Sequence, residues 1–262
     1  MTKPRGKNIP ISPFRGLVID LMHFTQKVPS VSIDRRMNLA VLAEARSRCF
    51  PKPTWTALFI KAYSIVAARD PALRQSYMEF PWPRIYEHPK NIVTLNVSRN
   101  VNGENVVLQD QIRSPENRSL PDLDARVRRC KEAPVEEINA YKRVMAVSWL
   151  PRFLRRSTIW STLNIFGRRR CHNMGTFAIT SVADRGAGVL NVATVLTTMI
   201  HYGLFDDEAC LDMRMAFDHR VLDGAQAADA LTGMEHALLN EVLHEVRGLA
   251  ARPSQFPLPL AA

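Results

Sequence analysis

The chain has 262 residues, of which 46% are hydrophobic and 23% are charged, a composition that excludes disorder of the whole chain. Its net charge of +10 favours an anionic partner without identifying it. The sequence contains no run of 18 uncharged apolar residues, so we expect no membrane-spanning helix. The basic N-terminus lacks the apolar segment of a signal peptide.

The four cysteines are widely spaced and form no C-x-x-C pair; they are Cys49, Cys130, Cys171 and Cys210. This arrangement is typical of buried free thiols in a reducing compartment, and the spacing does not suit a zinc site. We therefore expect a cytoplasmic protein without a bound metal.

The first part of the chain predicts an arm followed by three elements. Residues 1–12 show no apolar periodicity, so we expect a flexible arm. From Phe14 to Phe24 the apolar residues form a broad helical face. The alternation in residues 28–38 predicts a strand, and LAVLAEARSR (39–48) predicts a helix.

A long apolar helix and a hairpin follow. Thr54 is a suitable N-cap for residues 55–70, a helix whose apolar content predicts burial on most sides. NIVTLNVSRN and ENVVLQDQI predict two strands around Asn102-Gly103, a dipeptide typical of hairpin turns. SLPDLDARVRRCKE (119–132) predicts an amphipathic helix with Ser119 at its N-cap.

Residues 138–183, the acid-free segment, contain no Asp or Glu. Tryptophan and phenylalanine lie among its eight basic residues, which are Lys142, Arg143, Arg152, Arg155, Arg156, Arg168, Arg169 and Arg170. One interpretation is an extra helical hairpin that packs on the body and leaves its arginines solvated. A second is a peripheral membrane contact through residues 144–170. A third is a substrate wall or a dock for an acidic carrier protein. Nucleic acid is not expected as a partner, because no recognition fold accompanies the charge.

The C-terminal part predicts further strands and a helix. GTFAITSVAD (175–184) predicts a strand and a turn, whereas the apolar residues 189–203 fit either a strand or a helix. Residues 211–219 predict a strand with alternate apolar residues on one face, namely Met213, Met215 and Phe217. Residues 224–247 predict a helix, and residues 251–262 a proline-rich tail. This mixed order favours an α/β sandwich with a mixed sheet.

The stretch DHRVLDG ends the strand 211–219 and precedes the helix. An imidazole at such a junction, that of His219, titrates near neutrality and can take a proton from a hydroxyl, thiol or amine. Gly224 would allow the chain to turn into the helix. The alternative is a structural motif, with His219 in the core and Asp223 as a helix cap.

The segment FDHRVLDGA (217–225) closely resembles the signature of the catalytic domain of 2-oxoacid dehydrogenase dihydrolipoamide acyltransferases. Chloramphenicol acetyltransferases share its His-x-x-x-Asp-Gly core. GTFAITS (175–181) is similar to a Gly-Thr-Phe segment upstream of the family's histidine, and a weaker resemblance covers most of residues 11–247. Standard members carry lipoyl and subunit-binding domains before this one; the present sequence starts close to the catalytic domain, so we expect a free-standing enzyme.

The resemblance implies the chloramphenicol-acetyltransferase-like fold, a two-layer α/β sandwich with a mixed sheet, assembled as a homotrimer with active sites between subunits. Residues 13–250 would form this single domain, with a basic, aromatic-rich insertion around 138–172. A coenzyme A thioester would enter the site as co-substrate from one side and the acceptor from the other. No tightly bound cofactor is expected.

The resemblance also implies residue roles. The catalytic set would be His219 as base, Thr180 and Asp223, with Asp223 structural and Arg15 as its salt-bridge partner. Where the family uses a serine to hydrogen-bond the oxyanion, the alignment places Thr180, whose hydroxyl can make the same donation. Ser181 is the alternative donor and the residue expected to contact the co-substrate.

The function implied is acyl transfer from a coenzyme A or acyl-carrier-protein thioester to a hydroxyl, amine or thiol of a small-molecule or lipid-like acceptor. Two alternatives stay open. The chain could be an acyltransferase core that works with lipoyl domains in trans, or a catalytically silent scaffold of the same fold. The protein is expected in the cytoplasm, with membrane association left open by the acid-free segment.

Overall fold

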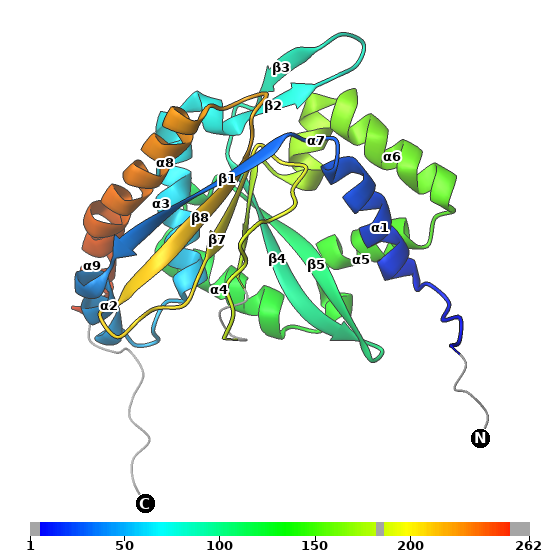
Figure 1. Ribbon diagram of the computed structural model, residues 1–262. Coiled ribbons are helices and arrows are strands. Elements are labelled where there is room, and N and C mark those ends of the chain that lie inside the picture. Colours follow the sequence, from blue (N-terminus) through cyan, green and yellow to red (C-terminus); the bar gives the residue numbers. More distant parts are fainter. Residues whose placement is uncertain (1–5, 182–185, 252–262) are drawn as a thin grey trace, which may run out of the picture.

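A six-stranded mixed sheet organises the computed structural model, which describes residues 6–181 and 186–251. The strand order is β1-β8-β7-β6-β4-β5 (Figure 1). The strands are β1 (Ser30–Asn38), β4 (Ile92–Val101), β5 (Glu104–Arg113), β6 (Phe177–Thr180), β7 (Thr198–Tyr202) and β8 (Cys210–Asp218). Strand β6 runs parallel to both of its neighbours, and the other pairs are antiparallel. A separate small hairpin, β2 (Gln75–Met78) and β3 (Arg84–Glu87), was not predicted from the sequence.

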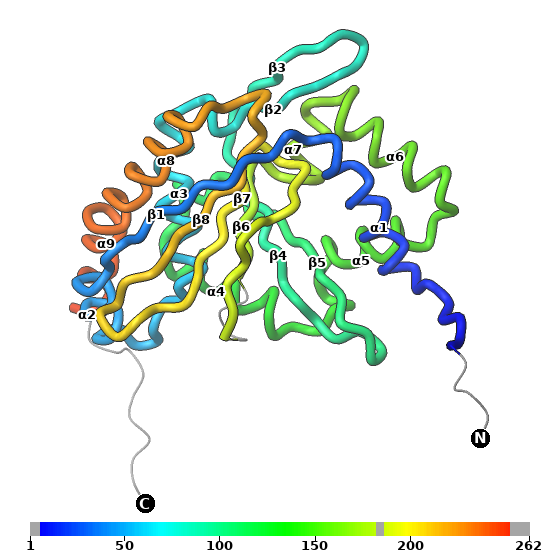
Figure 2. The backbone as a smooth tube through the Cα atoms, in the orientation of Figure 1, coloured from blue at the N-terminus to red at the C-terminus, as the bar shows by residue number. Residues whose placement is uncertain are grey.

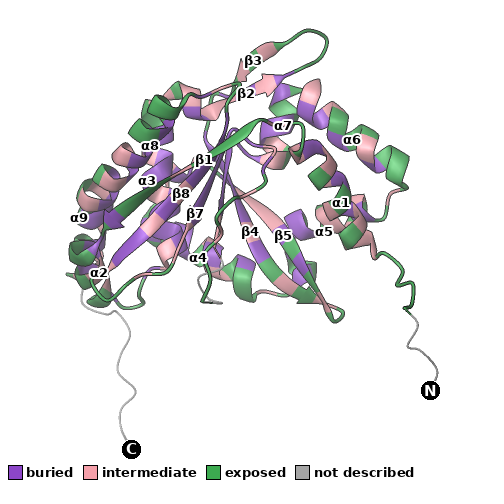
Figure 3. Cartoon of the chain, viewed as in Figure 1, coloured by how far each residue is buried: buried purple, intermediate pink, exposed green. Residues whose placement is uncertain are grey.

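One face of the sheet packs against a layer of helices (Figures 1 and 2). These helices are α2 (Ala40–Ser47), α3 (Trp55–Arg69), α4 (Leu120–Glu132), α8 (Gly224–Ala237) and α9 (Leu243–Ala250). A π-helical turn at Leu238–Val242 joins the last two. The predicted alternation in β8 is confirmed, since Met213, Met215 and Phe217 are fully buried in the core between sheet and helices (Figure 3).

The predicted two-layer α/β sandwich with a mixed sheet is confirmed. Thr54 and Ser119 cap α3 and α4 as expected, because each side-chain oxygen accepts a hydrogen bond from a backbone N–H of the first turn. The ambiguous apolar residues 189–203 form a loop followed by β7, and the loop lies on the face of the sheet opposite the main helical layer, where Leu196 packs with Ala178 and Met199.

The predictions for residues 1–5 and 252–262 lie outside the described residues. Residues 6–12 form no helix or strand, and Ser12 caps α1 (Pro13–Thr25). None of the described helices is long and apolar enough to cross a membrane. All four cysteines are free and buried, as expected. Burial raises the pKa of the Cys130 thiol to about 12 and that of the Cys171 thiol to about 11.

The acid-free segment forms three helices before it enters strand β6; they are α5 (Asn139–Ser148), α6 (Arg152–Asn164) and α7 (Gly167–Met174). Helices α5 and α6 lie with α1 beside the β4–β5 end of the sheet (Figure 1). The expectation that the arginines are all solvated is wrong, because Arg155 and Arg170 are buried. The guanidinium groups of this segment therefore satisfy polar groups inside the molecule as well as at its surface.

A buried ion-pair cluster fixes α6 on α1. Asp20 of α1 is fully buried, and its two carboxylate oxygens accept hydrogen bonds from Arg155 Nε at 2.6 Å and Arg156 Nε at 2.7 Å. Burial alone raises the pKa of this carboxyl, but the hydrogen bonds and charges of the two arginines bring the pKa below its ordinary value. The cluster ties the acid-free segment to the N-terminal helix.

Replacing this carboxylate should destabilise the protein strongly. We expect Asp20→Asn to lower the free energy of unfolding by about 3 kcal/mol, because it leaves the buried Arg155 without a counter-charge. The matched control is Glu44→Gln, which breaks the exposed Glu44–Arg48 pair and should cost less than about 1 kcal/mol. Denaturant unfolding measures both variants, and equal losses would contradict the structural role given to Asp20.

Candidate active site

His219 projects from a turn that its two neighbours hold in place. Asp218 is fully buried at the end of β8, and its carboxylate accepts hydrogen bonds from Arg220 Nε at 2.9 Å and Arg220 Nη2 at 2.7 Å. Between them, the His219 backbone N–H donates to the carbonyl of Pro29 at 3.0 Å. Its imidazole is exposed, with the ring centred 5.6 Å from the ring of Phe217. The alternative of His219 as a core histidine is therefore wrong.

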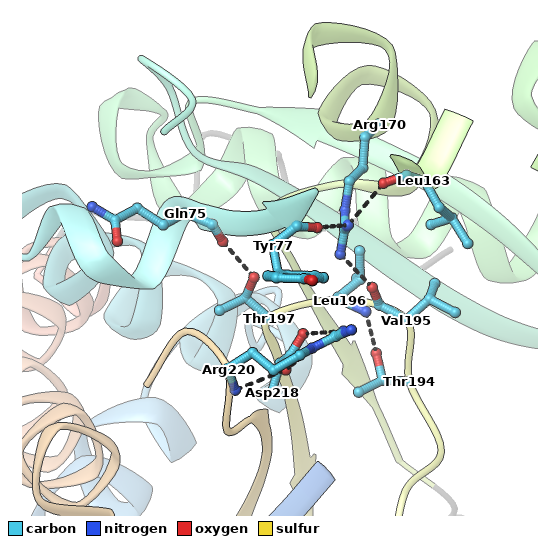
Figure 4. A network of polar contacts seen from close by, with 10 residues as sticks. All are labelled: Gln75, Tyr77, Leu163, Arg170, Thr194, Val195, Leu196, Thr197, Asp218 and Arg220. Atoms are coloured by element: carbon cyan, nitrogen blue, oxygen red, sulfur yellow. Dashed lines mark hydrogen bonds and ion pairs between the residues drawn. The ribbon is translucent and has the colours of Figure 1, made fainter. Parts of the chain in front are cut away.

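A second layer of contacts supports this turn (Figure 4). The guanidinium of Arg220 lies 4.2 Å over the ring of Tyr77, a cation–π arrangement. The buried guanidinium of Arg170 donates to the backbone carbonyls of Tyr77, Leu163 and Val195. Its burial lowers the pKa of Arg170 to about 10, so the group stays charged near neutral pH. An arginine of the acid-free segment thus positions the ring on which Arg220 rests.

Asp223 is a helix cap. Its carboxylate accepts from the Gln226 backbone N–H at 2.9 Å, and the Gln226 side chain accepts from the Asp223 N–H at 3.0 Å, which is a complete capping box. The chain enters α8 at Gly224, as expected, but the turn does not require a glycine there: its backbone is not in the left-handed region, and a Cβ would meet nothing within 4 Å.

The salt bridge expected between Arg15 and Asp223 is not formed within the subunit. Arg15 lies on α1, whereas Asp223 begins α8, on the other side of the molecule (Figure 1). Among the described residues, the ion pairs of the chain do not include either side chain. The cap satisfies the Asp223 carboxylate instead.

Thr180 ends β6 on the sheet face opposite the main helical layer. Gly175 lies just before this strand. Its φ of +89° and its close approach to Thr94 require a glycine at that position. Opposite Thr180 in the neighbouring strand is His201, fully buried, whose Nε2 accepts from the Val189 N–H at 3.0 Å. The Ser181 hydroxyl donates to the Tyr202 carbonyl at 3.1 Å. Sequence reasoning missed His201, because no motif surrounds it.

Thr180 and His219 of one subunit lie far apart. In the register of the sheet, Thr180 lies opposite His201 of β7, and His201 lies opposite Arg214 of β8. His219 follows Arg214 by five residues, which corresponds to about 17 Å along an extended strand. The two candidate groups therefore cannot meet at one reacting carbon within a single chain.

Comparison with solved structures places this arrangement in a known fold. The catalytic core of Azotobacter vinelandii dihydrolipoamide acetyltransferase superposes with a TM-score of 0.64 at 16% identity, over 94% of each chain. A probable dihydrolipoamide acetyltransferase from Listeria monocytogenes gives a TM-score of 0.63 at 16% identity, over 89% of this chain and 94% of that one. This chain has the fold of the dihydrolipoamide acetyltransferase catalytic core.

Chloramphenicol acetyltransferase has the same fold at greater distance, with a TM-score of 0.50 at 10% identity, over 84% of this chain and 94% of that chain. Neither a protein-family model nor a curated protein matches the sequence. Within this acetyltransferase fold, the described residues contain no group of three or more His, Cys, Asp or Glu side chains that could hold a metal ion.

The cap at the start of α8 can be tested by stability. We expect Asp223→Ala to lower the free energy of unfolding by about 1 kcal/mol, because it leaves a backbone N–H of the first turn unpaired. Asp223→Ser retains a capping oxygen and should stay close to the parent protein. Thermal or denaturant unfolding distinguishes them, and a Ser variant as unstable as the Ala variant would argue against the capping role.

Proposed function

We propose that the protein is an acyltransferase that moves an acyl group from a thioester of coenzyme A, or of a carrier protein, to a nucleophilic acceptor. The observation that supports this most directly is the exposed imidazole of His219, fixed between a buried carboxylate and its bidentate arginine at the end of β8. A neutral imidazole in this position is available as a general base. The fold shared with acetyltransferases supports the same reaction.

The active site would lie between two subunits. Thr180 lies level with Arg214 in the sheet, and His219 lies about 17 Å further along β8. The two groups can therefore cooperate only when Thr180 of one subunit faces His219 of the next. This requirement supports a closed homo-oligomer with equivalent interfaces, and the family resemblance implies that the oligomer is a trimer. The exposure of His219 in the isolated chain agrees with this arrangement.

The mechanism is direct transfer. His219 takes the proton of the acceptor's hydroxyl, amine or thiol as that atom attacks the thioester carbonyl carbon. The carbonyl oxygen becomes an oxyanion, to which the Thr180 hydroxyl of the neighbouring subunit donates a hydrogen bond. The tetrahedral intermediate collapses and its carbon–sulfur bond breaks. The departing thiolate takes the proton from His219, so that it leaves as a thiol and the neutral base is restored. One shared channel suffices, because bringing the two substrates together supplies much of the rate.

The Azotobacter vinelandii protein supports the choice of residues. A serine, a histidine and an asparagine were investigated there for their roles in the catalytic mechanism, and the asparagine lies four positions after the histidine. Asp223 lies four positions after His219 in this chain. In our proposal Asp223 acts through the cap that orients the start of α8, and Thr180 takes the part of the serine.

Subunit mixing tests both the chemistry and the shared site. We expect His219→Ala to abolish thiol release from acyl-coenzyme A, and Thr180→Val to slow it on the order of 100-fold, whereas Thr180→Ser stays active. In trimers reassembled from equal amounts of the His219→Ala and Thr180→Val chains, about a quarter of the interfaces regain both groups. Activity should therefore return on mixing.

Four outcomes would count against the proposal. Retained turnover in His219→Ala would show that His219 is not the general base. Failure of the two variants to complement, although they exchange subunits, would show that the active site is not shared between subunits. Transfer only to dihydrolipoyl groups would favour a core that works with lipoyl domains in trans, and the absence of transfer from any acyl donor, with or without dihydrolipoamide, would favour a silent scaffold.

A further inference from the structure

A cavity of about 630 Å³ lies between the β4–β5 end of the sheet and helices α1, α5 and α6. This volume is within the range of small-molecule sites. Its floor comes from the sheet face that points away from the main helical layer, including Asn96 and Gln109, which pair across β4 and β5. Most of its walls are aliphatic, among them Leu17 and Leu21 of α1, Val147 of α5 and Ile159 of α6.

The cavity lies beside the candidate oxyanion donor. Leu95 of β4 is in register with Ile179 of β6, so Asn96 and Thr180, the next residues on both strands, are neighbours on the same sheet face. The Oδ1 atom of Asn96 is buried and has no hydrogen-bond partner among the described residues. A buried unpaired acceptor is unfavourable, and a ligand hydroxyl or amine at this point would satisfy it.

We infer that this cavity is the acceptor site of the proposed acyl transfer, and that the acceptor has a hydrocarbon body ending in a hydroxyl or amine. Its hydrocarbon part lies along α1, α5 and α6, and in the bound state before transfer its O–H or N–H donates to Asn96 Oδ1 beside Thr180. For transfer, the O–H rotates, or a second N–H points, towards His219 of the next subunit, which takes that proton. Of the charged lining residues, Arg15 and Arg143 are exposed, which places them at the mouth of the cavity. The carboxylate of Glu104, which also lines the cavity, accepts a hydrogen bond from the Ser12 hydroxyl at 2.7 Å. The inference rests on the proposed function for the chemistry and on the cavity for the substrate class.

The acid-free segment has a direct part in this site. Helices α5 and α6 form the wall opposite the sheet, and the Asp20 cluster holds α6 against α1 on that side. Without these helices the aliphatic face of α1 would line an open groove. The segment therefore encloses the hydrocarbon part of the acceptor and sets its length.

Binding of 1-octanol and 1-butanol to the assembled protein, measured by calorimetry, tests the cavity without requiring turnover. Octanol should bind on the order of 100-fold more tightly than butanol, because each additional methylene is removed from water. Val147→Trp fills the cavity and should abolish octanol binding. The matched control Val41→Trp introduces the same side chain on α2, outside the cavity, and should bind octanol as the parent does.

Acyl transfer to octylamine and butylamine then tests the acceptor role. We expect a similar preference for octylamine in kcat/KM, reduced at least tenfold in Val147→Trp. Equal binding of the two alcohols, or octanol binding that survives in Val147→Trp, would overturn the inference even if dihydrolipoamide is acylated. Tight octanol binding without transfer from any thioester to any acceptor would leave the cavity as a hydrocarbon site and refute the acyltransferase.

A second surface is supported by separate observations. We define the aromatic ridge as Trp149, Phe153 and Trp160 together with Phe80 and Trp82 of the β2–β3 hairpin. Phe153 and Trp160 are two helical turns apart on one face of α6, and the rings of Trp160 and Phe80 are 5.8 Å apart. Trp149 is 73% exposed and Trp82 is 66% exposed. Large aromatic side chains gathered in this way mark a surface for binding.

The charge around the ridge selects its partner. Arg152 is exposed at the start of α6, where it also lies 3.7 Å from Asp20. Arg168 and Arg169 are exposed on α7, the helix that packs against α6. The acid-free segment contributes no carboxylate, although Glu79 is exposed in the hairpin. Aromatic residues flanked by exposed arginines fit the headgroup region of an anionic bilayer. We propose that the aromatic ridge docks on an anionic membrane surface, which would bring the cavity close to hydrocarbon-rich acceptors.

Vesicle flotation of the full chain tests this docking. The protein should float with phosphatidylcholine vesicles that contain roughly one-third phosphatidylglycerol at low salt, and not with pure phosphatidylcholine or in high salt. The double variant Trp149→Ala/Phe153→Ala should lose at least tenfold in binding, while Phe50→Ala, which removes an exposed ring after α2, should not. Absence of flotation would overturn the proposal, as would a ridge variant that changes the oligomeric state while leaving flotation intact.

Discussion

The ion pair between Asp218 and Arg220 is the interaction on which the candidate site depends. A fully buried carboxylate is tolerable only when it is paired and hydrogen-bonded, and here the guanidinium two residues later supplies both contacts. Pairing across a single intervening residue forces that residue outward. The position of His219 therefore follows from the need of Asp218 for a counter-ion, and the contacts that fix the turn come from the backbone of His219 and from its two neighbours.

This pair is itself supported by the acid-free segment. Tyr77 carries the guanidinium of Arg220 on its ring, and Arg170 donates to the Tyr77 carbonyl while it reaches two further carbonyls. A buried arginine has five donors to satisfy, so it fixes several backbone segments at once. The same segment uses Arg155 and Arg156 to neutralise Asp20. The segment needs no acidic residue of its own for this cluster, because the carboxylate partner, Asp20, belongs to α1.

The sequence was most informative where one local rule determines the outcome. Apolar alternation located β8, side-chain oxygens located the caps of α3 and α4, and Asn102-Gly103 located the β4–β5 hairpin. It failed where an outcome depends on residues distant in sequence. The buried state of Arg170, the role of Tyr77 and the neighbourhood of His201 arise from contacts between separate segments. The predicted Arg15–Asp223 pairing is not formed within the subunit, for a different reason: the nearby Gln226 already satisfies the Asp223 carboxylate through a capping box.

The separation of Thr180 from His219 connects assembly to chemistry. In the proposed assembly, the base His219 follows the end of β8, whereas the oxyanion donor Thr180 lies level with Arg214 in the middle of β8, and the register of the strands fixes that separation. A rigid sheet cannot bend to join them, so a single chain holds two incomplete halves of a site. The cavity lies with Thr180, whereas the proton acceptor must come from the next subunit. In this proposal, the interface determines how an acceptor bound beside Thr180 of one subunit meets His219 of the next. Loss of assembly would then remove activity while leaving every subunit folded.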